Sequence, residues 1–88
     1  LTTVDAQNLM NSAKSESVKS ACKKVYEALR YSDPMSNEAL SGIESQITNK
    51  FDSFSQAVYD DDYELAEANT DELLNLINNR NAKCKALK

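Results

Sequence analysis

Histidine is absent from this 88-residue chain, and glycine and proline occur once each, as Gly42 and Pro34. β-Sheet proteins depend on tight turns, and those turns draw heavily on glycine, proline and Asn-Gly pairs. A chain so poor in both residues is therefore predicted to be all-α. The missing histidine also removes the commonest general base and the commonest zinc ligand together.

The remaining polar residues do not form a recognisable catalytic or cofactor site. Two cysteines cannot complete the four-ligand shell of a structural zinc ion, and a single glycine cannot build a phosphate-binding loop. Serine and threonine are plentiful, but a nucleophilic hydroxyl needs a neighbouring base, and here only lysine could serve. We therefore expect no enzyme activity, no bound metal and no cofactor.

Charge is distributed unevenly in the second half of the chain. Seven acidic residues and no basic one lie within 60–72, whereas four basic residues and no acidic one lie within 80–88. Calcium loops arrange their oxygen ligands around a glycine, which the acidic run lacks. Acids near a helix N-terminus and bases near its C-terminus both stabilise the helix dipole. We therefore interpret this pattern as a polarised helix and not as a metal site.

The overall charge limits the classes of partner. The chain has 14 acidic and 10 basic residues, which gives a formal net charge of −4. Nucleic-acid-binding proteins neutralise phosphates with a concentrated basic face, so neither nucleic acid nor an acidic membrane surface is expected as a partner. No apolar run approaches the ~20 residues that span a bilayer. We expect no membrane insertion of this segment.

Apolar residues recur at three- and four-residue steps, which is the period of one face of an α-helix. The pattern predicts helices over 3–30, 36–58 and 61–78, followed by a short helix or frayed tail over 82–88. The polar residues 14–17 interrupt the first of these helices, which bends or splits there. The most regular apolar stripe belongs to the second helix and comprises Leu40, Ile43, Ile47, Phe51, Phe54 and Val58.

Local end signals accompany these helices. Thr2 with Asp5, and Asp61 with Glu64, have the spacing of a capping box. Ser36 is a favourable N-cap for the second helix. Because the connections are short, consecutive helices are predicted to be antiparallel, which gives an up-down-up three-helix bundle in a single domain. This domain extends over residues 1–88 and ends in one of two alternatives, a short fourth helix that folds back or a frayed tail.

Whether Cys22 and Cys84 form a disulfide would show whether the chain folds back. In straight helices Cys84 lies about nine residues beyond the level of Cys22, an axial offset of ~13 Å. A disulfide needs Cα atoms within ~7 Å, so a Cys22–Cys84 bond requires the chain to reverse at 78–81. Two alternatives stay open: a disulfide, which would indicate an oxidising compartment, or two buried thiols that act as small apolar residues.

Four tyrosines near the predicted helix ends are candidate contacts for a partner protein: Tyr26, Tyr31, Tyr59 and Tyr63. The alternative is that their rings cover the ends of the core while their hydroxyl groups stay hydrated.

These observations favour a non-catalytic helical interaction or spacer module. Because the sequence begins with Leu1 and not with methionine, we expect a domain or mature fragment of a larger secreted or cell-surface protein, outside the cytoplasm. The alternative is a small cytoplasmic adaptor or immunity-type protein that binds another protein. A carrier of a small apolar ligand would need a cavity inside the bundle. The residue pattern names neither the protein partner nor the oligomeric state.

Overall fold

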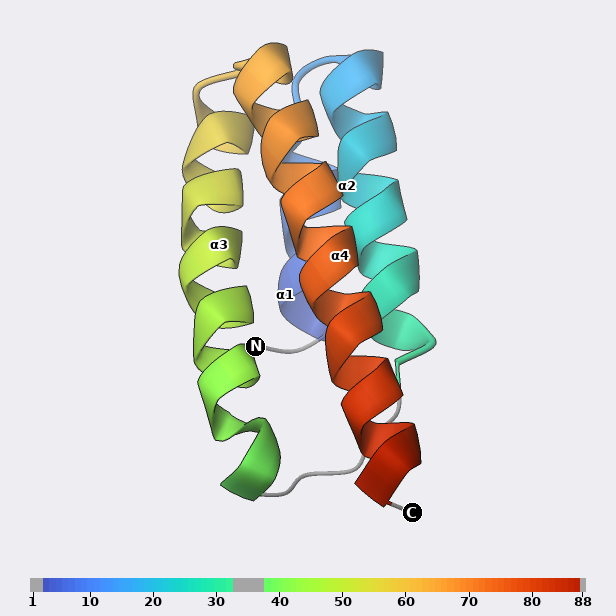
Figure 1. Ribbon diagram of the computed structural model, residues 1–88. Helices are drawn as coiled ribbons and strands as arrows, with labels where there is room; N and C mark the ends of the chain where they lie inside the picture. The colour runs from blue at the N-terminus through green and yellow to red at the C-terminus, as the bar shows by residue number, and fades with distance from the viewer. Residues whose placement is uncertain (1–2, 33–37, 88) are drawn as a thin grey trace.

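The computed structural model describes residues 3–32 and 38–87, and this part of the chain folds into four α-helices around one hydrophobic core (Figure 1). The elements are α1 (Thr3–Ser12), α2 (Glu16–Arg30), the 3-10 turn η1 (Glu38–Leu40), α3 (Ser41–Tyr59) and α4 (Tyr63–Leu87). The predicted all-α class is confirmed. The predicted signals at Thr2, Pro34 and Ser36 lie outside the described residues.

Of the two alternatives predicted for the helix over 3–30, a bend or a split, the structure shows the split: the chain breaks after Ser12 and reverses. Ser15 has extended backbone angles, and its hydroxyl accepts a hydrogen bond from the Val18 N–H at 3.4 Å. A serine at this position satisfies one of the free N–H groups of the new helix, so it starts α2 instead of continuing α1. α1 and α2 therefore form a helical hairpin.

The second predicted helix is confirmed in its core face. All six residues of its apolar stripe are buried, with Leu40 in η1 and the other five in α3. The predicted start at residue 36 lies outside the described residues, and regular α-helix begins at Ser41. α3 ends at Tyr59, within one residue of the predicted end.

The turn between α3 and α4 has the hydrogen bonds of a Schellman motif. The Asp62 N–H donates to the Ala57 carbonyl at 2.9 Å, and the Asp61 N–H donates to the Val58 carbonyl at 3.1 Å. Asp61 has φ of 54°, in the left-handed region. The Asp62 carboxylate then accepts from the Leu65 N–H at 3.2 Å. Asp62 is thus the N-cap of α4, which begins at Tyr63 and not at residue 61.

α4 is continuous through the asparagine-rich stretch at 78–81, so the predicted helix end at 78 is wrong, and so is the alternative in which the chain reverses there into a separate helix over 82–88. Ile77 and Cys84 lie on the same buried face, and Arg80, between them, pairs with Glu44 of α3 at 3.4 Å. Each asparagine makes the helix less stable than alanine would by only a few tenths of a kcal/mol. Packing of the face that carries Ile77 and Cys84 outweighs that penalty, so the helix extends to Leu87.

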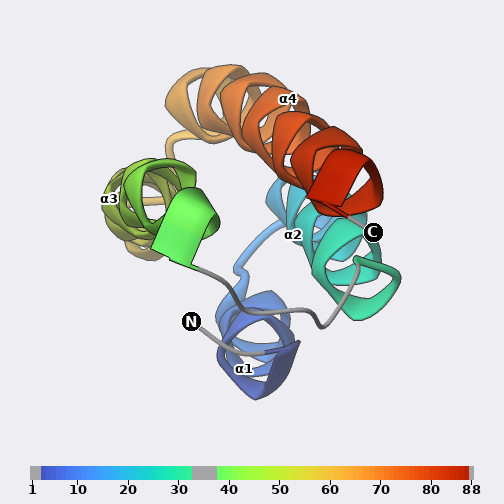
Figure 2. The ribbon, with the colours of Figure 1, turned by 60° about the horizontal axis from the view of Figure 1, so that its bottom comes forward.

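Consecutive helices run in opposite directions, so α1 and α3 are parallel to each other, as are α2 and α4 (Figure 1). Viewed along the bundle, α2 packs between α1 and α4, and α4 packs between α2 and α3 (Figure 2). α1 and α3 touch only lightly. The bundle measures 40 × 17 × 15 Å. Within the described ranges, no helix combines the length and apolar character that a membrane crossing requires.

Candidate functional site

Both cysteines are buried and free in the structure. A hydrogen bond of 3.1 Å from Ser15 Oγ to Asp61 Oδ1 places the starts of α2 and α4 at the same level. Counted from that level, Cys84 lies about 16 residues further along its helix than Cys22, an axial offset of ~24 Å. Without the fold-back, the Cα separation is far above the ~7 Å that a disulfide allows. Burial raises the pKa of the Cys22 thiol from 9.0 to about 11, opposed by a backbone hydrogen bond.

The structure does not gather the four candidate tyrosines into one patch. Tyr59 and Tyr63 flank the α3–α4 turn, whereas Tyr26 and Tyr31 lie near the C-terminal end of α2. The α3–α4 turn lies beside the start of α2 (Figure 1), so the first pair lies near the start of α2 and the second pair lies nearer its end. The four rings therefore do not form one continuous patch, and their role as partner contacts stays a prediction.

The individual tyrosines differ in their surroundings. Tyr26 packs against the core, whereas Tyr31 is 77 % exposed, with the Arg30 guanidinium 5.7 Å from its ring centroid. A side-chain hydrogen bond to Glu67, followed by the negative charge of Glu67 and by desolvation, raises the pKa of Tyr63. Tyr59 is 55 % exposed and lines a hollow between α1 and α3.

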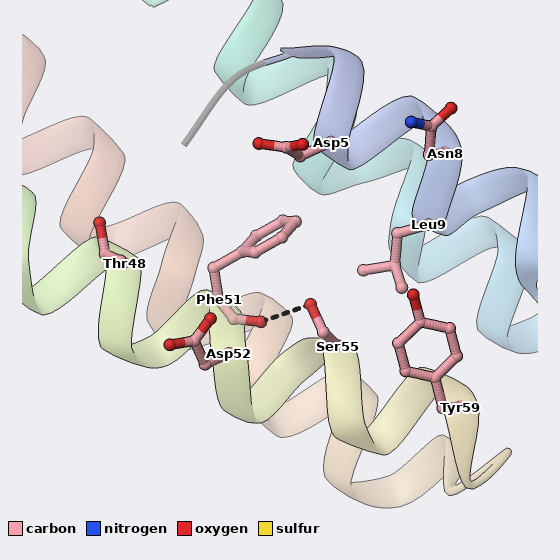
Figure 3. A pocket seen from close by; sticks show the side chains of 8 residues that line it. All are labelled: Asp5, Asn8, Leu9, Thr48, Phe51, Asp52, Ser55 and Tyr59. Atoms are coloured by element: carbon pink, nitrogen blue, oxygen red, sulfur yellow. Dashed lines mark hydrogen bonds between the residues drawn. The ribbon is translucent and has the colours of Figure 1, made fainter.

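This hollow, the α1–α3 groove, has a volume of about 410 Å³ and lies where the two helices barely touch (Figure 3). α1 contributes Asp5, Asn8 and Leu9, and α3 contributes Thr48, Phe51, Asp52, Ser55 and Tyr59. Leu9 and Phe51 are almost fully buried and provide the apolar floor. Figure 3 shows the carboxylates of Asp5 and Asp52 on opposite helices, with the Phe51 ring between the two helices.

The hydroxyl groups in the groove are engaged by the main chain. Thr48 Oγ1 donates to the Glu44 carbonyl at 3.0 Å, and Ser55 Oγ donates to the Phe51 carbonyl at 2.9 Å. A nucleophilic hydroxyl must instead share its proton with a side-chain base held by a third group. The hydroxyl groups of Thr48 and Ser55 therefore lack the hydrogen bonds of an activated nucleophile.

The charge around the groove has one sign. α1 contains no lysine or arginine, and α3 contains only Lys50. Lys50 pairs with Glu72 of α4, which turns its charge toward the other side of α3. Asp5 and Asp52 thus place one carboxylate on each of the two helices that line the groove.

Two other hollows are lined mainly by polar side chains. One, of about 350 Å³, lies on α3 near Ser41 and Asn49. The other, of about 330 Å³, lies between α2 and α4 and contains both Lys24 and Glu67, so its charges are mixed. Among residues 3–32 and 38–87, no three acidic or cysteine side chains gather closely enough to hold a metal ion.

Comparison of the chain with models of protein families, with curated proteins and with solved structures finds no significant match. The site must therefore be interpreted from its own residues.

The sequence pattern did not single out the groove, although one signal was present. Thr48, Asp52, Ser55 and Tyr59 recur at steps of four, three and four, one position beyond the core stripe of α3. This spacing defines a second face of the same helix. It could not reveal that α1 covers that face incompletely, because the reversal at Ser15 decides where α1 lies.

Proposed function

We propose that this protein is a non-catalytic helical interaction module that binds another protein through the α1–α3 groove. The observation that carries the proposal is the groove itself: about 410 Å³ between two helices of the same bundle that barely touch. Partner helices commonly bind in such grooves through their apolar faces. Leu9 and Phe51, which are 3 % and 7 % exposed, form a small apolar floor, and the polar residues around it form a rim that would make most of the contact.

Two further features support a binding role without catalysis. The chain has no histidine, and the groove hydroxyls of Thr48 and Ser55 donate to main-chain carbonyls. The half-exposed ring of Tyr59 at one end of the groove is the kind of side chain that contributes most to protein interfaces, because it buries a large area with few rotatable bonds.

Site-specific photo-crosslinking tests the proposal. A photoreactive amino acid is introduced at Thr48 in the groove and, as a control, at the exposed Asn75 of α4, in cells that produce the protein. We expect one adduct of defined mass from position 48 and none from position 75.

A variant that fills the groove provides the matched comparison. Ser55→Trp places an indole in the groove, so it should abolish the adduct at position 48 while thermal unfolding followed by circular dichroism shows an intact fold. Equal adducts from positions 48 and 75, or an adduct that survives Ser55→Trp unchanged, would contradict binding through the groove.

A further inference from the structure

We propose that α1 is a lid that opens at its contact with α3, turning about the hinge at 13–15, while α2, α3 and α4 stay packed together. Opening uncovers the apolar side chains under α1 and so controls access to the α1–α3 groove. The opening itself needs no partner, whereas its control of access rests on the proposed function. Three features support the lid: the few contacts that hold α1, the position of its hinge and the covered floor of the groove.

α1 contributes less to the core than any of the other three α-helices. It is 10 residues long, and of residues 4–12 only Ala6 and Leu9 are buried, whereas α2 has four buried residues and α3 and α4 have six each. α1 packs mainly against α2, touches α3 lightly and lies across the bundle from α4 (Figure 2). A helix this short is marginal without tertiary contacts. Opening of α1 therefore exposes less apolar surface than separation of α2, α3 or α4 would.

The hinge lies at the C-terminal end of α1. Ser15 has extended backbone angles, and its hydroxyl accepts a hydrogen bond from the Val18 N–H, so α2 has its own N-cap and does not need α1 to begin. The same hydroxyl donates to Asp61 Oδ1 at 3.1 Å, which fixes this end of the hairpin to the α3–α4 turn. Motions of this kind turn on a few residues at the ends of elements. The N-terminal end of α1 is therefore the end that moves away from α3.

The closed lid covers the apolar floor of the groove. Leu9 of α1 and Phe51 of α3 both line the groove, yet they are only 3 % and 7 % exposed. Because these two side chains belong to the two helices that separate, opening exposes both of them. A partner that uses this apolar surface binds the open form, and its apparent affinity is reduced in proportion to the fraction of open molecules.

Native-state hydrogen exchange, followed by ¹⁵N NMR on the full chain, tests the opening. The amides of Leu9 and Asn11, beyond the first turn of α1, are compared with those of Phe54 in α3 and Leu73 in α4. We expect the α1 amides to share one opening equilibrium and to exchange about 100-fold faster than the core amides. Low concentrations of urea should accelerate the core amides and leave the α1 amides almost unchanged, because opening of the lid exposes little surface.

Two variants separate opening of the lid from global unfolding. Ile77→Val removes a buried methyl group from α4, which stays packed when α1 opens, so it should accelerate the core amides about two- to tenfold and leave the α1 amides unchanged. Leu9→Ala removes a contact that opening breaks, so it should accelerate the α1 amides about tenfold or more. If Ile77→Val accelerated the α1 and core amides by the same factor, α1 would open only with the whole bundle, and the inference would be refuted.

A hinge variant tests the control of access. Lys14 is exposed in the hinge and does not line the groove, and glycine at this position favours the more mobile open form. Lys14→Gly should therefore raise both the exchange of the α1 amides and the yield of the adduct at position 48 about two- to fivefold. Ile77→Val is the matched control and should leave the adduct yield unchanged. Faster α1 exchange in Lys14→Gly with an unchanged adduct yield would refute the control of access.

The experiments distinguish failure of the lid from failure of the proposed function. Exchange of the α1 amides together with the core amides would refute the lid. Absence of any wild-type adduct at position 48 would instead refute binding through the groove, whatever the exchange of α1 shows.

Discussion

The turn between α3 and α4 shows how one side chain can serve two elements. Asp61 occupies the left-handed position of the Schellman motif, where glycine is usual. Aspartate tolerates this conformation better than most residues, and here its carboxylate also accepts a hydrogen bond from Ser15 at the start of α2. The same residue therefore ends α3 and holds the α1–α2 hairpin beside it.

This arrangement predicts a larger loss of stability for valine than for glycine at position 61. Asp61→Val should lower the free energy of unfolding by ~1–2 kcal/mol, because a β-branched residue is strained at positive φ. Asp61→Gly should stay within ~1 kcal/mol of the wild type, because relief of strain offsets the lost bond to Ser15. Urea unfolding measures both values.

The neighbouring residue provides the control. Asp60 has φ of −83°, in the right-handed region, so Asp60→Val should change stability by less than ~0.7 kcal/mol. An Asp61→Val variant as stable as the wild type would show that the turn does not hold Asp61 in the left-handed conformation.

At the scale of elements, α3 presents two faces with different roles. Ile47, Phe51, Phe54 and Val58 form its core stripe, and the residues one position later form one wall of the α1–α3 groove. Only Phe51 belongs to both faces, since it packs in the core and lines the groove. The core face sets the position of α3 in the bundle, and that position in turn orients the groove face.

A substitution at Phe54 tests the contribution of the core face of α3 to stability without altering the groove. Its side chain is 1 % exposed, and its ring centroid lies 6.1 Å from that of Phe51. Phe54→Ala should lower the free energy of unfolding by ~3–5 kcal/mol, a large fraction of the total stability of a domain of this size. Thermal unfolding measures the effect.

Two further variants serve as controls for this prediction. Phe54→Leu retains most of the volume and should unfold cooperatively at a lower temperature even if the alanine variant does not fold. Ser53→Ala, at an exposed position of the same helix, should change stability by less than ~0.5 kcal/mol. An unchanged melting temperature for Phe54→Ala would contradict the central position of this ring.

At the scale of the whole molecule, the arrangement of the helices decides the state of the cysteines. Cys22 and Cys84 lie at different levels of two parallel helices, α2 and α4, and each is buried in the common core. Their separation follows from the continuity of α4 through 78–81. The thiols therefore contribute as small apolar groups, and the high pKa of Cys22 keeps it protonated at neutral pH.

Alkylation followed by mass measurement checks this arrangement. In denaturant and without reductant, we expect two alkyl groups per chain, because both thiols are free. In the native protein the same reagent should react slowly, because both side chains are buried and the Cys22 thiolate is scarce below pH 11. A monomer that resists alkylation in denaturant until reductant is added would contain a Cys22–Cys84 bond, which the continuous α4 does not allow.

The amino-acid sequence by itself determined the helical class, the core stripe of α3 and the break between α3 and α4. These features depend on local rules: the scarcity of glycine and proline, the three- and four-residue spacing of apolar side chains, and the capping-box spacing of Asp61 and Glu64. The α3 stripe was predicted in full for this reason. Local rules also marked the interruption at residues 14–17, but they did not distinguish a bend from a reversal.

The tertiary structure alone decided the remaining features. Three of them depend on which faces pack together: the hairpin of α1 and α2, the straight path of α4, and the opposite placement of the tyrosine pairs. Asn69 illustrates the point: its side chain is 5 % exposed, and its Nδ2 atom has no hydrogen-bond partner among the described residues, although asparagine is usually found in solvent. The α1–α3 groove likewise joins residues about 40 positions apart in the chain. Its existence depends on how far α1 packs against α3, which is a balance among nonlocal contacts and is not encoded in the periodicity of either helix.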